Sequence, residues 1–246
     1  MPTRSDVKDD PQDAPTETRR RRLLYGRRKG PKLSAHQTQL LEILLPQLRL
    51  TLQSGADPRS YFSSLDTAAT SDVWLEVGFG AGEHLLWQAE HHPNVGMIGA
   101  EPYISGIAKL LSKISLSIGG SGRNIRIHDG DARDILEALP DASLGRVFIL
   151  FPDPWPKVRH HKRRFIQTNT LDMLARVMKP GGELRFASDD ADYAAWTLER
   201  VIAHPAFEWS AICAQDWKLR PPDWPETRYE TKALHGPPTY FAFRRR

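Results

Sequence analysis

The amino-acid sequence predicts an α/β protein built on a doubly wound, mostly parallel, seven-stranded sheet. Two observations predict this fold. Short apolar runs alternate with helical patterns from residue 73 onward, and a glycine-rich turn follows the first run. Strands separated by helices pair in parallel through right-handed crossovers, which produces a doubly wound sheet. The 246 residues, 40% apolar and 26% charged, have the balance of one globular domain with a small appendage.

The chain before this pattern is predicted to form a basic extension and one helix. Residues 1–18 are rich in Pro, Asp, Thr and Glu and are expected to be disordered. Leucines at helical spacing over 37–50 predict a helix that is short or kinked, because Pro46 lies inside it. We therefore expect a disordered, basic N-terminal arm over 1–35 and a single domain over 36–246.

The alternating region supplies the strands and helices in turn. The predicted strands are 73–77, 97–101, 124–128, 146–151, 183–188, 207–212 and 239–244. One predicted helix begins near residue 82, and the others span 103–118, 131–138, 165–178 and 191–203.

Cysteine use and hydropathy exclude several classes. Cys213 is the only cysteine, so an intramolecular disulfide is impossible and a cysteine-based zinc site is not expected. The adjacent His160 and His161 have no acid or cysteine at ligand spacing, so no metal is expected. The start lacks an apolar signal segment and no apolar run has membrane-spanning length, which favours the cytoplasm and no membrane partner. No obligate protein partner is evident, and the oligomeric state stays open.

The net charge of +4 is distributed unevenly. Residues 19–32 and 157–164 hold 13 of the 34 Lys and Arg and no acid, which leaves the remainder of the chain at −9. Basic patches on an acidic body attract polyphosphates such as nucleic acid, although a solvated tail and loop would have the same composition.

The glycine turn and its neighbouring acids predict a nucleotide-type ligand. Gly78, Gly80 and Gly82 follow the first strand, but Glu83 occupies the third glycine position of the dinucleotide motif and disfavours a pyrophosphate. An NAD-dependent oxidoreductase is therefore disfavoured.

Three acids are candidates to line the same ligand site as this turn. Glu101 ends the second strand, where it can accept hydrogen bonds from ribose hydroxyls. Asp131 is placed to reach an adenine amino group or simply to cap a helix. Glu76 lies within a buried strand and needs a partner, which a cationic ligand would supply. An acid-lined cleft suits S-adenosyl-L-methionine better than NAD.

Five segments together resemble the bacterial tRNA (guanine-N7-)-methyltransferases. They are LEVGFGAGEH (75–84), GAEPY (99–103), FPDPWPK (151–157), KPGGELRFASD (179–189) and TRYE (227–230). The resemblance runs from about Arg27 to the C-terminus, and FPDPWPK with its basic continuation is the most specific part. It implies a Rossmann-like class I methyltransferase fold that uses S-adenosyl-L-methionine to modify a guanine of the tRNA variable loop. Pro156 departs from the family, other members of which can have histidine there.

The resemblance also implies roles for individual residues. Asp153 matches the catalytic position. The cofactor-binding residues are expected to be Glu76, Gly78, Gly80, Gly82, Glu101, Asp131 and Asp153. The substrate-contacting residues are expected to be Lys157, Asp189, Thr227, Arg228, Tyr229 and Glu230. The RNA-contacting residues are expected to be Arg159, His160, His161, Lys162, Arg163 and Arg164.

The chemistry explains why Asp153 suits this site. Guanine N7 has a lone pair and no proton, so the reaction needs positioning and charge stabilisation rather than a base. Pro152 and Pro154 are expected to make the Asp153 loop rigid, and Trp155 could either anchor that loop or stack on a base. The alternatives are a methyltransferase that acts on another RNA, a protein or a small molecule, and a non-catalytic RNA-binding module.

Overall fold

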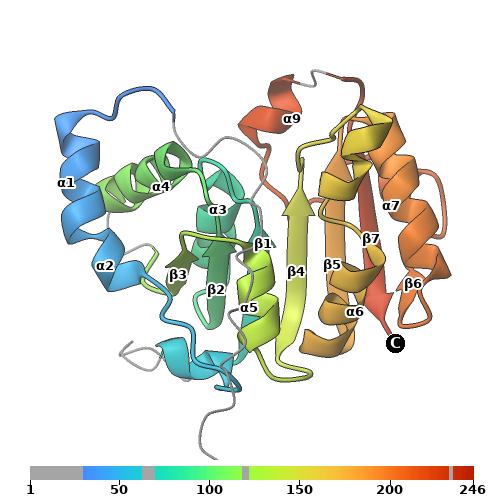
Figure 1. The fold of residues 1–246 in the computed structure, drawn as a ribbon, viewed down its shortest axis with the longest axis horizontal. Helices are drawn as coiled ribbons and strands as arrows, with labels where there is room; N and C mark the ends of the chain where they lie inside the picture. Colours follow the sequence, from blue (N-terminus) through green and yellow to red (C-terminus); the bar gives the residue numbers. More distant parts are fainter. Residues whose placement is uncertain (1–29, 63–69, 118–121, 233–234) are drawn as a thin grey trace, which may run out of the picture.

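The seven strands of the computed structural model form one sheet in the order β3-β2-β1-β4-β5-β7-β6 (Figure 1). The structure describes residues 30–62, 70–117, 122–232 and 235–246, so most of the predicted basic arm lies outside it. The strands are β1 (Asp72–Val77), β2 (Val95–Ala100), β3 (Ile125–His128), β4 (Leu144–Leu150), β5 (Met178–Ser188), β6 (Phe207–Trp209) and β7 (Thr239–Arg245). Only β7 runs antiparallel to its neighbours, which confirms the predicted doubly wound, mostly parallel sheet.

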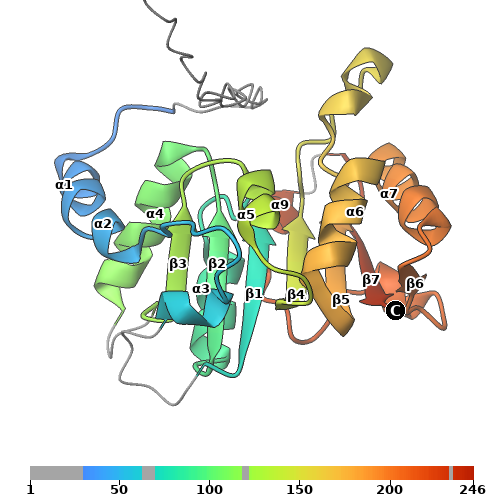
Figure 2. The same cartoon turned by 60° about the horizontal axis from the view of Figure 1, so that its bottom comes forward.

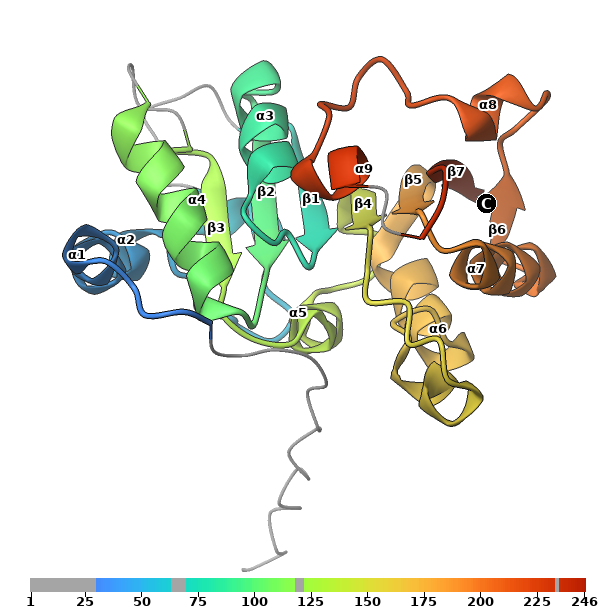
Figure 3. The same ribbon diagram turned by 90° about the horizontal axis from the view of Figure 1, so that it is seen from above.

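Helices cover both faces of this sheet (Figure 3). The longer helices are α1 (Ala35–Ile43), α3 (Glu83–His91), α4 (Ile104–Leu116), α5 (Ala132–Ala138), α6 (Thr168–Val177) and α7 (Ala191–Ala203). One apolar cluster joins α3 and α4 to one face, and a larger cluster joins α5, α6 and α7 to the other. Among the described residues, no helix combines the length and apolar character needed to cross a bilayer.

Strand β1 shows how the sequence divides its side chains between the two faces. Val73 and Leu75 belong to the cluster under α5 and α6, whereas Trp74 belongs to the cluster under α3. Because side chains alternate along a strand, Glu76 points to the same face as Trp74. A carboxylate therefore enters the face that α3 covers.

Some elements begin or end at other residues than predicted: β5 already begins at Met178, and β6 ends at Trp209. Helix α6 begins at Thr168 rather than at 165, because the backbone N–H groups of Phe165 and Ile166 donate to the Tyr193 hydroxyl. The kink predicted near Pro46 is confirmed, since α1 ends at Ile43 and a separate short helix follows it.

Five short helices complete the described chain, and four of them were not predicted. They are α2 (Leu45–Leu48), which continues the predicted kinked helix, and η1 (Pro58–Phe62), η2 (Val158–Arg163), α8 (Gln215–Lys218) and α9 (Arg228–Lys232). Two of them bear on function: η2 stands away from the body of the protein (Figure 2), and α9 lies beside the carboxyl end of β4 (Figure 1).

Candidate active site

Two pockets meet at Gly78, where the carboxyl ends of β1 and β4 lie side by side. The strand order reverses here, because β2 and β3 lie to one side of β1 while β4 and β5 lie to the other, and ligands of open α/β sheets bind at such a point. The first pocket is lined by Val77, Gly78, Ala100, Pro102, Gly130, Asp131, Ala132, Arg133, Pro152, Asp153, Trp155, Arg163 and Phe165. The second is lined by Glu76, Gly78, Phe79, Glu83, His84, Leu150, Phe151 and Thr227.

The glycine turn shapes both pockets, and two of its glycines do so for different reasons. Gly78 and Gly82 have φ angles of 73° and 75°, which side chains with a Cβ rarely adopt. A Cβ at Gly78 would meet no atom within 4 Å, so this backbone is open to a ligand. A Cβ at Gly82 would lie 2.6 Å from a methyl group of Leu110, so this glycine lets the turn pack tightly on α4.

Glu101 is held by the backbone of two turns. Its carboxylate accepts hydrogen bonds from the backbone N–H groups of Gly80 (2.7 Å) and Tyr103 (2.9 Å). Burial, reinforced by the charges of Asp153 and Glu76, outweighs these bonds and raises the pKa of Glu101 to about 7. Each oxygen keeps a second lone pair that can accept from a ligand hydroxyl.

Asp131 caps a helix, as one of its two predicted interpretations required. Its side chain accepts from the backbone N–H of Arg133 at the start of α5 (3.0 Å), and it also forms an ion pair with the Arg133 guanidinium (2.6 Å). Asp131 also lines the first pocket, so its capping role does not prevent a cofactor contact. That contact stays a prediction.

Glu76 has a partner that the sequence did not reveal. Its carboxylate lies 2.8 Å from Nδ1 of His84, and the two residues are 3% and 2% exposed. The cationic ligand expected for Glu76 is therefore not its only partner. The spacing of eight residues across a turn and into a helix carries no recognisable signal, so sequence reasoning missed His84.

Glu83 is also paired within the chain, by Lys113 of α4 at 2.9 Å. That ion pair and the associated hydrogen bond help to hold the pKa of Glu83 below its usual value against the opposing effect of burial. The charge of Glu83 is thus balanced, so the argument that it repels a pyrophosphate is weaker than the sequence indicated.

Asp153 follows β4 in a loop with unusual backbone at both ends. Phe151 and Trp155 have φ angles of 48°, a region that costs non-glycine residues roughly 1–3 kcal/mol each. No described residue forms a hydrogen bond or ion pair with the Asp153 carboxylate. The residue is exposed as a whole, yet nearby protein desolvates its carboxyl group and raises its pKa.

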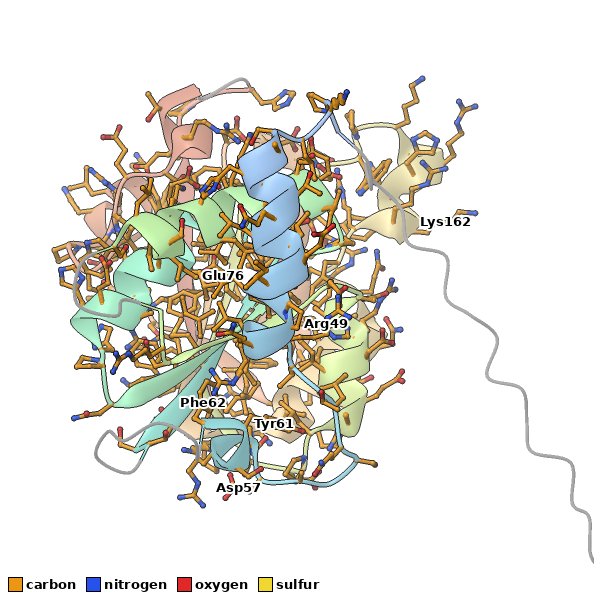
Figure 4. The ribbon with its side chains drawn as sticks, turned by 90° about the vertical axis from the view of Figure 1, so that its left-hand side faces the viewer. Arg49, Asp57, Tyr61, Phe62, Glu76 and Lys162 are labelled. Carbon is orange, nitrogen blue, oxygen red and sulfur yellow. The ribbon has the colours of Figure 1, made fainter. Side chains whose placement is uncertain are left out.

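The basic segment, defined here as residues 157–164, divides into exposed and buried parts. Lys157, Arg159 and Lys162 are exposed, and Lys162 points away from the body of the protein in Figure 4. Arg164 is 2% exposed and is held inside the protein, and its predicted RNA contact stays a prediction. Its Nε donates to the carbonyl of Pro154 at 2.8 Å, and its guanidinium pairs with Asp192.

Three other members of the basic segment contact aromatic rings. The Arg163 guanidinium lies 4.9 Å from the centre of the Trp155 ring, and His160 meets the same ring edge to face. His161 packs edge to face on Trp196. Trp155 also lines the first pocket, so both interpretations of this residue, loop anchor and stacking platform, remain compatible with its position.

The TRYE segment begins the short helix α9. The Thr227 hydroxyl accepts from the backbone N–H of Glu230 (3.3 Å), and the Glu230 carboxylate accepts from that of Thr227 (3.4 Å), which is a capping box. Glu230 also binds the Tyr240 hydroxyl (2.6 Å) and Arg220 (3.2 Å). Thr227 alone of this segment lines the second pocket, and the Tyr229 side chain lies outside the described residues.

Asp189 stands apart from the pockets. It directly follows β5 and accepts a hydrogen bond from the backbone N–H of His235 (3.2 Å), so it holds the start of the segment that leads to β7. Neither pocket is lined by Asp189, and its substrate contact stays a prediction.

The acids and the glycine turn of this cleft fit S-adenosyl-L-methionine. Glu76 and Asp153 offer negative charge to a cation, Glu101 offers acceptors to ribose hydroxyls, and the open face of Gly78 admits a ligand between them. Over the part of the chain that the structure describes, no group of three or more side chains could hold a metal ion.

The fold and this acid-lined cleft together define a class I methyltransferase. The solved structure of the 16S rRNA methyltransferase KamB matches with a TM-score of 0.52 at 16% identity over 80% of this chain and 96% of that one. The aminoglycoside resistance methyltransferase NpmB1 matches with a TM-score of 0.51 at 15% identity over 80% and 100%. At such identities these similarities establish the fold.

Sequence comparison identifies the family. The family model "Putative methyltransferase" matches residues 70–241. The tRNA (guanine-N(7)-)-methyltransferase of Rhodospirillum rubrum is 49% identical over 95% of this chain and 91% of its own length. That of Paramagnetospirillum magneticum is 49% identical over 90% and 92%. The chain belongs to the tRNA (guanine-N(7)-)-methyltransferase family.

Proposed function

We propose that this methyltransferase moves the methyl group of S-adenosyl-L-methionine to N7 of a guanine in the variable loop of tRNA, in the cytoplasm. The observation that carries the proposal is the position of Asp153. This carboxylate lies at the first pocket, only a few residues before the exposed cations of the basic segment. The family relationship supports the substrate, and the variable loop follows from the sequence resemblance.

The acids of the cleft bind and orient the cofactor. Glu101 accepts from ribose hydroxyls with the lone pairs that Gly80 and Tyr103 leave available. Asp131 lines the first pocket, where its carboxylate can reach the base. When bound, S-adenosyl-L-methionine supplies an electrophilic methyl group on a sulfonium centre.

Asp153 positions the guanine. Its ionised carboxylate accepts hydrogen bonds from N1–H and the exocyclic amino group, which leaves N7 free because N7 is an acceptor at another edge of the base. The negative charge also stabilises the positive charge that the purine gains during transfer. No group has to remove a proton from N7, because N7 presents a lone pair and no proton.

The exposed cations hold the tRNA backbone. Lys157, Arg159 and Lys162 can contact phosphates, which fixes orientation without reading sequence. Residues 36–246 act as one domain in this proposal, and the arm over 1–35 would add further phosphate contacts.

A direct test identifies the acceptor atom. The protein is incubated with methyl-labelled S-adenosyl-L-methionine and unmodified tRNA, and the product is reduced mildly and treated with aniline. Methylation at N7 makes the nucleotide labile, so we expect cleavage at one guanine of the variable loop. A tRNA with 7-deazaguanine at that position should bind but accept no methyl group. Methylation of the deaza substrate, or an aniline-resistant product, would place the target atom elsewhere.

A further inference from the structure

A chain of buried polar groups connects Glu76 to the loop that precedes α9. The Glu76 carboxylate contacts Nδ1 of His84 (2.8 Å), and Nε2 of His84 contacts the side-chain amide nitrogen of Gln88 (3.1 Å). The same amide nitrogen donates to the backbone carbonyl of Asp223 (2.9 Å). Glu76, His84 and Gln88 are 3%, 2% and 0% exposed, so water does not compete for these contacts.

The Asp223 carbonyl fixes the orientation of the Gln88 amide. A carbonyl oxygen only accepts, so the Gln88 atom beside it must be the NH2 group. That group has two hydrogens, and the second one points to Nε2 of His84. Nε2 must then accept, which leaves the ring proton on Nδ1 for donation to Glu76. The backbone of one loop thereby selects the tautomer of a histidine on α3.

This tautomer determines the charge at the second pocket. A neutral imidazole donates a hydrogen bond to Glu76 without cancelling its negative charge. Apolar rings surround the pair, since Phe148 and Trp224 meet His84 edge to face at 4.6 and 6.0 Å. Among the described residues, His84 is the one that pairs with Glu76. A buried carboxylate in such surroundings attracts a cation strongly.

We propose that His84, held in its Nδ1–H tautomer by Gln88 and the Asp223 carbonyl, is a positioning residue that presents ionised Glu76 to the positively charged methionyl end of the cofactor. This inference rests on the proposed function, because it assumes that S-adenosyl-L-methionine occupies the cleft. Glu76 and Thr227 line the same pocket, so the Asp223 loop and the start of α9 border the place where that charge is bound.

The tautomer can be measured in the protein without ligand. Long-range proton–nitrogen NMR spectra of the 15N-labelled protein, with His84→Asn used to assign the signal, distinguish the three ring states. We expect a protonated Nδ1 and an unprotonated Nε2 near neutral pH. An imidazolium or the opposite tautomer would overturn the proposal. Gln88→Leu removes the donor to Nε2, and we expect the His84 signals to show a mixture of tautomers.

Cofactor binding by calorimetry gives an independent readout. His84→Leu removes the donor to Glu76, and we expect the Kd for S-adenosyl-L-methionine to rise about tenfold or more. His84→Asn keeps a donor near the Nδ1 position and should restore most of the affinity, whereas KM for tRNA should be unchanged. His91→Leu, an exposed histidine of the same helix, is the matched control. S-adenosylhomocysteine has the ammonium group but no sulfonium, so its binding separates the two cationic groups. If His84→Leu weakens binding of both ligands equally, Glu76 faces the ammonium. If it weakens S-adenosylhomocysteine binding less, Glu76 faces the sulfonium.

Two failures are distinguishable. Wild-type protein that binds no S-adenosyl-L-methionine would contradict the proposed function. A folded His84→Leu variant that binds S-adenosyl-L-methionine as tightly as the wild type would contradict this inference alone.

Discussion

The acid-lined cleft and the basic segment both depend on charge, but the structure treats their charges in opposite ways. Glu76 and Glu101 are buried and are each held by specific donors from the turns and from α3. Lys157, Arg159 and Lys162 are exposed and project from a short helix. Figure 4 shows both situations, with Glu76 in the interior and Lys162 at the outer edge. A buried charge acts through its partner, whereas exposed charges act through their number.

Each region contains one exception, and the two exceptions make the same point. Arg164 belongs to the basic segment by sequence but is buried against Asp192 and Pro154. Glu83 belongs to the cleft by sequence but is paired with Lys113. In both cases a charge that seemed available for a ligand is used to hold the protein together.

Asp153→Asn should have the largest effect on activity. The variant keeps the size of the side chain and removes the charge that stabilises the cationic purine. We expect kcat to fall by about 10²- to 10³-fold. Because nearby protein desolvates the Asp153 carboxyl group and raises its pKa, wild-type turnover should also decline on the acid side, and that decline should vanish in the variant. Near-normal turnover in a variant with an unchanged Tm would remove Asp153 from the mechanism.

Arg164→Ala should separate the two parts of the basic segment. The buried guanidinium holds the Pro154 carbonyl and packs on the rings of Tyr193 and Trp196. Its loss should lower the free energy of unfolding by about 2–4 kcal/mol. Lys162→Ala is the matched control and should change stability by less than about 0.5 kcal/mol. Denaturant unfolding measures both, and equal stabilities would show that Arg164 is no anchor.

Glu101→Gln should make cofactor binding independent of pH near neutrality. The ionised carboxylate accepts from the ribose hydroxyls, and its pKa is about 7, so wild-type affinity should rise as pH increases from 5 to 8. Binding at pH 6 should release a proton, which calorimetry in buffers of different ionisation enthalpy detects. The variant should bind about tenfold more weakly at pH 8 and release none. Proton release by the variant would assign the pH dependence to another group.

Glu101 also makes the free energy of unfolding depend on pH. The pKa of Glu101 is higher in the folded protein than its ordinary value of 4.5, so the folded state binds the proton more tightly. Its contribution to the free energy of unfolding therefore falls as pH rises from about 4.5 to about 7 and is level above that. Comparing the free energies of unfolding of Glu101→Gln and the wild type across this pH range isolates the contribution of Glu101.

Neutralising Lys157, Arg159 and Lys162 together should weaken tRNA binding and leave cofactor binding unchanged. Each lost phosphate contact should reduce the salt slope of log K by about 0.7 to 0.9, and each single variant should have a small effect. Arg123→Ala, an exposed cation just before the edge strand β3, is the control. A salt slope that stays the same would mean that these cations are only solvated.

The sequence by itself determined the order of strands and helices, because hydrophobic periodicity reflects which side chains a strand or helix must bury. It also determined the family, since FPDPWPK and its companion segments are specific enough to be recognised. It placed the glycine turn, Glu101 and Asp153 at the ends of strands. Gly78 and Asp153 line the pockets, and Glu101 lies between two lining residues, Ala100 and Pro102.

Only the tertiary structure decided which charged residues are paired. Glu76 meets His84, Glu83 meets Lys113, and Arg164 meets Asp192, and each pair joins elements that the sequence treats as independent. The physical reason is that a charge is stabilised by atoms close in space, and burial makes that partner decisive. Sequence spacing does not indicate such contacts. The basic segment, which the sequence predicts to be one RNA-contacting surface, therefore contains both exposed cations and the buried Arg164.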